Sequence, residues 1–101
     1  MRYFVIGDED AVLGFSMVGV GGTAVTTDDE ARRALSSAIA DSTIGIIIIT
    51  ERIADRMRSM VDKYIFTRQF PLIVEIPDRS GRAPDRPSLR DMINAAIGIR
   101  L

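Results

Sequence analysis

The sequence predicts an α/β fold: a small open parallel sheet of four strands with helices on both faces, followed by a tethered C-terminal helix. Two observations support this prediction. Over residues 1–77, short apolar runs alternate with segments of helical periodicity, which is the pattern of strand–helix–strand units. Residues 78–87 then form a charged tether with Pro and Gly, and residues 88–101 carry one more amphipathic pattern. A chain of 101 residues has room for one hydrophobic core, so we expect a single domain overall.

Local signals define the first two strand–helix pairs. Residues 3–6 are consecutively apolar, as expected of a strand covered on both faces, and Asp8 is placed to cap a first helix. A short second strand is expected at residues 23–25. Thr27 and Glu30 then have the spacing of a capping box, so a second helix begins there. Its predicted buried stripe consists of Ala31, Ala34, Leu35, Ala38 and Ile39.

The central strand is predicted at residues 44–49, which carry no polar side chain on either face and therefore require helices above and below. Thr50 is expected to cap a third helix, and residues 72–76 form the fourth strand. Right-handed crossovers between parallel strands favour the spatial order 2-1-3-4, as in flavodoxin-like and receiver-like folds. The third helix is expected to direct inward Ile53, Met57, Met60, Val61 and Tyr64.

Composition excludes most enzyme classes. The chain has no Cys and no His, so thiol nucleophiles, imidazole bases and zinc sites built from these ligands are excluded. The formal net charge is -1, which argues against nucleic acid as a partner. We expect no catalytic residues, no cofactor and no metal. The apolar run at 44–49 is far shorter than the roughly 20 residues of a membrane span, so we expect a cytoplasmic protein without membrane insertion.

The segment from Gly19 to Ala24 matches the G-x-G-x-x-A pattern of dinucleotide-binding proteins. That pattern binds pyrophosphate only between a strand and the start of a helix. Here it follows a predicted helix and leads into a predicted strand, so we interpret it as a turn.

Carboxylates at the predicted carboxyl edge of the sheet suggest an alternative function. Asp8 and Asp10 follow the first strand and Glu51 follows the third, where a receiver-like signalling domain would hold Mg²⁺. The competing interpretation is that these residues occupy first turns of helices, where negative charge is stabilising by about 0.3–1 kcal/mol each. The absence of an Asp at the end of the third strand favours this second interpretation.

The terminal segment is predicted to form an amphipathic helix. Ser88 is placed as its cap, Asp91 stands at its third position and Gly98 closes it. Such a helix either contacts another protein or folds back onto the sheet face shared with the first helix. A third alternative is a homo-oligomer that exchanges this helix between copies. The predicted partner-binding stripe consists of Leu89, Met92, Ile93, Ala96 and Ile97.

Several stretches resemble one known family. They read VIGDED at 5–10 with Gly-Phe and Gly-Val pairs shortly after, IIIITE at 46–51, PLIVEIP at 71–77, and Ser-Leu with Ala-Ile-Gly within 88–98. Together they resemble the F subunit of the V-type ATP synthases, which include the archaeal and bacterial A-type enzymes.

The resemblance implies a non-catalytic central-stalk (rotor) subunit, cytoplasmic and peripheral to the membrane as part of the complex. It implies a small parallel α/β body bound to the D subunit, the coiled-coil shaft, and turning inside the A/B catalytic head. ATP chemistry would belong to the A subunits. The chain would help to couple ATP hydrolysis or synthesis to ion transport, and its terminal stripe would match the family's closing helix.

Overall fold

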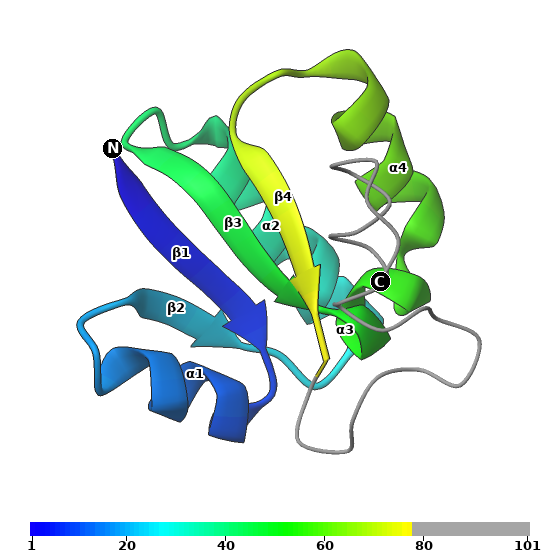
Figure 1. Cartoon of the computed structure of the whole chain (residues 1–101). Helices are drawn as coiled ribbons and strands as arrows, with labels where there is room; N and C mark the ends of the chain where they lie inside the picture. The colour runs from blue at the N-terminus through cyan, green and yellow to red at the C-terminus, as the bar shows by residue number, and fades with distance from the viewer. Residues whose placement is uncertain (78–101) are drawn as a thin grey trace, which may run out of the picture.

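The computed structural model describes residues 1–77, which form a parallel sheet of four strands in the order β2-β1-β3-β4 (Figure 1). This confirms the predicted fold class and strand order. The strands are β1 (Arg2–Gly7), β2 (Gly21–Ala24), β3 (Ile44–Thr50) and β4 (Leu72–Ile76). The helices are α1 (Glu9–Ser16), α2 (Asp28–Ala40), α3 (Glu51–Arg56) and α4 (Arg58–Thr67).

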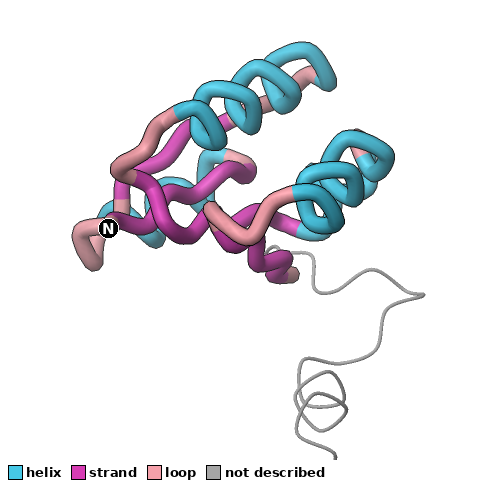
Figure 2. The backbone as a smooth tube through the Cα atoms, turned by 90° about the horizontal axis from the view of Figure 1, so that it is seen from above, coloured by secondary structure: helices cyan, strands magenta, loops and turns pink. Residues whose placement is uncertain are grey.

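The hydrophobic core lies between one face of the sheet and the helices α2, α3 and α4 (Figure 2). Helix α1 packs against β1 and β2 on the opposite face and contributes no residue to this core. The stripe predicted for α2 is buried as expected. The side chains that the sheet contributes to the core are Phe4, Ile6, Ile44, Ile47, Ile49 and Ile73.

Two predicted helix caps are confirmed. The Asp8 carboxylate accepts a hydrogen bond of 2.7 Å from the Ala11 amide and so begins α1. At the start of α2, the Thr27 hydroxyl accepts from the Glu30 amide while the Glu30 carboxylate accepts from the Thr27 amide, which completes the capping box.

The glycine-rich segment is a turn, as the sequence predicts. It connects the end of α1 to β2, and Gly19 has a φ of 87°, a conformation that favours glycine. Strand β2 begins at Gly21, earlier than the sequence predicts. At Gly22 the backbone of β2 passes so close to β1 that a Cβ atom would collide with the carbonyl oxygen of Val5. Glycine is therefore required here for strand pairing.

The predicted third helix is wrong in one respect, because it is divided into α3 and α4 at Met57. Met57 has φ −137° and ψ 43°, outside the helical region, and its amide donates to the Ala54 carbonyl oxygen to end α3. Its side chain is buried in the core. The break lets α4 take a new direction while Met57 and Val61 remain inside.

Thr50 occupies the N-cap position of α3, as predicted, but it does not cap the helix with its side chain. Its side chain makes no capping hydrogen bond at the start of α3 and is only 1% exposed. A Cβ atom added to Gly7 would lie 3.0 Å from the Thr50 methyl carbon, so the two residues are close neighbours across β1 and β3. Thr50 therefore packs against β1 instead of turning back toward the helix.

Among residues 1–77, no second helical layer of the kind that the sequence predicts covers one half of the sheet. Helix α1 packs against β1, where Val5 is fully buried, and against β2 (Figure 1). On the same face, β3 and β4 carry apolar side chains in cross-strand register, Ile46 beside Leu72 and Ile48 beside Val74. We call this surface the open face; its exposed or half-buried members are Tyr3, Ile46, Ile48, Leu72 and Val74.

Candidate functional site

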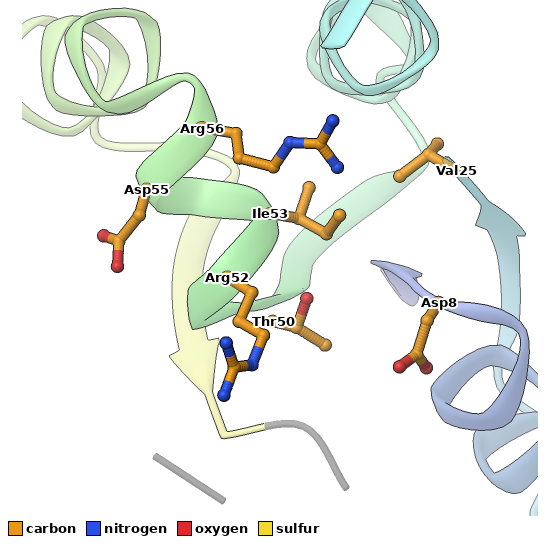
Figure 3. Close-up of a pocket in the computed structure, with 7 residues that line it drawn as sticks. All are labelled: Asp8, Val25, Thr50, Arg52, Ile53, Asp55 and Arg56. Carbon is orange, nitrogen blue, oxygen red and sulfur yellow. The ribbon is translucent and has the colours of Figure 1, made fainter. Parts of the chain in front are cut away.

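A cleft of about 490 Å³ lies at the carboxyl edge of the sheet. It opens between the ends of β1 and β3, where the strand order changes direction, and this is where open α/β sheets bind ligands. Figure 3 shows Arg52 and Arg56 extending from α3 on one side, with Asp8 on the other. The lining residues are Asp8, Val25, Thr50, Arg52, Ile53, Asp55 and Arg56.

Arg56 fixes one wall of this cleft. Its Nε atom lies 2.8 Å from a carboxylate oxygen of Asp28, and its Nη1 atom donates a hydrogen bond of 3.3 Å to the Thr26 carbonyl oxygen. These contacts join the end of α3 to the start of α2. The guanidinium group of Arg56 therefore serves to hold two helices together.

The carboxylates of the predicted cation pocket are not brought together as a metal site. Asp8 is engaged in capping α1, and Glu51 is buried in the first turn of α3. Within residues 1–77, no group of three or more His, Cys, Asp or Glu residues is arranged to hold a metal ion. Asp8 and Glu51 therefore occupy first turns or caps of helices, as the competing interpretation holds.

Arg58 forms a charged cluster that the sequence analysis missed. It contacts Asp55 on α3, Asp62 on α4 and Glu75 on β4. Hydrogen bonds to Glu75, followed by those to the two aspartates, raise the pKa of Arg58 and keep it charged. The i, i+3 and i, i+4 spacing of Asp55, Arg58 and Asp62 is a local signal for part of this cluster. For Glu75, the signal is that it is the one charged residue of the otherwise apolar strand β4, which indicates that it has a cationic partner.

A second hollow, of about 350 Å³, lies between α1 and the end of β4. It is largely apolar and adjoins the last described residue, Pro77. Its lining residues are Asp10, Ala11, Gly14, Phe15, Val18, Ile76 and Pro77. Together with the open face, this hollow gives the described part of the chain an apolar surface suited to protein contacts.

The predicted partner-binding stripe falls outside the described residues. Leu89, Met92, Ile93, Ala96 and Ile97 all follow Pro77, so their role stays a prediction. The division into a body, a tether at 78–87 and a terminal helix at 88–101 is untested for the same reason. Within residues 1–77, no helix is both long and apolar enough to cross a membrane.

Comparison with a solved structure agrees with the fold. The crystal structure of the F subunit of the V-type ATP synthase from Archaeoglobus fulgidus matches with a TM-score of 0.60 at 22% sequence identity. The match covers 74% of this chain and 95% of that one. At this level of identity the likeness concerns the fold.

Sequence comparisons establish the family. The F subunit of the A-type ATP synthase of Methanothermobacter thermautotrophicus is 38% identical over 99 residues, covering 96% of this chain and 92% of the relative. The corresponding F subunit of Pyrococcus furiosus is 35% identical over 106 residues, covering 100% and 98%. The family model of the ATP synthase (F/14-kDa) subunit matches residues 4–94. The chain therefore belongs to the ATP synthase (F/14-kDa) subunit family, non-catalytic subunits of the A-type and V-type ATP synthases.

Proposed function

We propose that the chain is a central-stalk subunit that binds the D subunit, the coiled-coil shaft of the rotary complex. Its place is inside or beneath the A/B catalytic head, peripheral to the membrane. There it helps to couple ATP hydrolysis or synthesis in other subunits to ion transport. The observation that carries this proposal is the extent of the family match, which runs past the α/β body to residue 94 and so into the terminal amphipathic segment.

The described body supports a role in assembly. Exposed apolar side chains lie on the open face, among them Tyr3, Leu72 and Val74, and the hollow beside α1 is also largely apolar, while the ion pairs of Arg56 and Arg58 join one element to another. Surfaces of this kind are typical of protein contacts. The ion pair of Arg56 connects α3 to α2, and that of Arg58 connects α4 to β4. These contacts favour a body that moves as one unit, which suits a subunit that transmits torque.

The terminal stripe supplies the contact that we assign to the shaft. Its Leu89, Met92, Ile93 and Ile97 are large apolar side chains, and burying each one contributes roughly 1.5–3 kcal/mol. A coiled coil presents an apolar and charged helical surface on which such a stripe can lie. In this proposal residues 1–77 are the body, 78–87 the tether and 88–101 the binding helix.

The proposal is tested by mixing the purified full-length chain with the purified D subunit. Analytical ultracentrifugation is expected to show a complex of defined stoichiometry, with no free chain left when the shaft protein is in excess. Sedimentation of the two proteins as separate species would contradict the proposal. The chain alone serves as the control, because a mass that rises with its own concentration would indicate the helix-exchanging homo-oligomer instead.

A further inference from the structure

We propose that the segment joining α4 to β4, residues 63–72, is a second docking surface, which contacts an acidic and apolar surface on another subunit of the complex. We call it the basic aromatic segment. The inference rests on the proposed function in that it requires the chain to be assembled. It concerns the described body, however, and is independent of the terminal stripe.

The first observation is the exposure of large apolar side chains. Phe66 at the end of α4 is 85% exposed and Phe70 is 71% exposed, and both Ile65 and Leu72 are exposed as well. Exposed aromatic rings gathered within a few positions are enriched at the centres of protein interfaces. Leu72 also belongs to the open face, so the apolar surface continues from this segment onto β4.

The second observation is charge. Between Lys63 and Leu72 the sequence contains two cations, Lys63 and Arg68, and no carboxylate, whereas residues 1–77 as a whole hold more carboxylates than cations. The guanidinium of Arg68 lies 5.8 Å from the centre of the Tyr64 ring. No ion pair found among residues 1–77 involves either cation.

Arg58 contacts the two carboxylates that flank this segment in the sequence. The flanking carboxylates, Asp62 and Glu75, would be the nearest in sequence to neutralise Lys63 and Arg68. Both contact Arg58 instead, at 3.3 Å and 2.7 Å. The segment itself holds two cations, no carboxylate and exposed aromatic rings on an otherwise acidic body, and complementarity calls for a partner that carries carboxylates around an apolar centre.

Charge also distinguishes this partner from two others. In a symmetric contact with a second copy, the same patch meets itself, so Lys63 and Arg68 would approach like charges. On an anionic membrane each cation contributes only about 1 kcal/mol, so two of them hold a protein weakly. A different subunit with an acidic surface is the partner that the observations favour.

The experiment places a photoreactive aromatic residue, p-benzoylphenylalanine, at position 66 of the full-length chain in cells that assemble the intact ATP synthase. The isolated complex is irradiated and the cross-linked peptides are identified by mass spectrometry. We expect cross-links to one other subunit, at a site whose neighbours include Asp or Glu. The same probe at Leu13 on α1, which is 62% exposed, is the control for non-specific capture and is expected to give at least tenfold less of this product.

A charge-reversal variant tests the electrostatic part. Lys63→Glu combined with Arg68→Glu is expected to lower the yield of the cross-link at least tenfold, whereas Arg32→Glu with Arg33→Glu, an equal change of charge on exposed positions of α2, is expected to leave it unchanged. Cross-links to lipid, to a second copy or to no molecule in an assembled complex would overturn the inference. If the chain does not co-purify with the complex at all, the proposed function itself fails.

Discussion

Arg58 on α4 donates two hydrogen bonds, of 2.7 and 2.8 Å, to the two carboxylate oxygens of Glu75 on β4. This paired contact crosses from a helix to the edge strand of the sheet, one residue beyond the break at Met57. Because Glu75 is largely shielded from water, the contact fixes the direction that α4 takes after the break.

Replacing Arg58 tests the importance of this contact. We expect Arg58→Met, which keeps an apolar side chain of similar length, to lower the free energy of unfolding by about 1–3 kcal/mol, because Glu75 is shielded from water and loses the two hydrogen bonds from the guanidinium group. Urea denaturation of the full-length chain measures the change. Arg32→Met removes an exposed ion pair with Asp29 and is expected to cost under about 0.5 kcal/mol. Equal losses in the two variants would show that the contact with Glu75 has no special role.

The hydrogen bonds that Glu30 accepts at the start of α2 make stability depend on pH. Hydrogen bonds from the Thr26 hydroxyl, the Thr26 amide and the Thr27 amide lower the pKa of Glu30 to about 2, from an ordinary value of 4.5. A carboxyl whose pKa is lower in the folded state stabilises the fold fully above its unfolded pKa, and this stabilisation is lost as the pH falls toward the folded pKa.

Glu30→Gln is therefore expected to be less stable than the natural chain at pH 7, and the difference is expected to shrink between about pH 4.5 and pH 2, where Glu30 becomes protonated. Thermal unfolding of both proteins over this range measures it. A difference that stays constant down to pH 2 would mean that the ionised carboxylate is not what stabilises the start of α2.

Two glycines should respond in opposite directions to the same substitution. Gly22→Ala places a methyl group against the Val5 carbonyl oxygen and is expected to destabilise the fold by about 1–3 kcal/mol by forcing β2 away from β1. Gly14→Ala, inside α1 with open space around it, is expected to stabilise the fold by up to about 1 kcal/mol. Denaturant midpoints of the two variants decide this, and a stable Gly22→Ala protein would mean that β2 does not pair closely with β1.

The sequence was sufficient to predict the strand order and the core-facing residues of α2. Consecutive apolar residues identify β1 and β3, and the capping signals at Asp8 and Thr27 mark where α1 and α2 begin. These features are local, because each depends on residues within one or two turns of each other. The family resemblance, which extends over most of the chain, is confirmed by the comparisons.

Features that depend on distant contacts were not predicted. The break at Met57 lies beside a buried side chain, that of Met57 itself, and beside Arg58, which contacts β4. The helical periodicity of the sequence continues across this position, so it does not reveal the break. The open face was not predicted because β3 carries isoleucines on both of its faces, so the sequence does not distinguish the face covered by helices from the other. Sequence therefore could not show that α1 covers only half of that face.

The central claim is that the terminal stripe binds the shaft, and the most direct measurement is the affinity of the full-length chain for the D subunit. Ile93→Asp combined with Ile97→Asp places two charges in the stripe and is expected to weaken binding at least tenfold, since each buried isoleucine contributes roughly 1.5–3 kcal/mol. Asn94→Asp with Ala95→Asp adds the same charge on the opposite side of the predicted helix and is expected to keep nearly the natural affinity. Equal affinities for all three proteins would contradict the account.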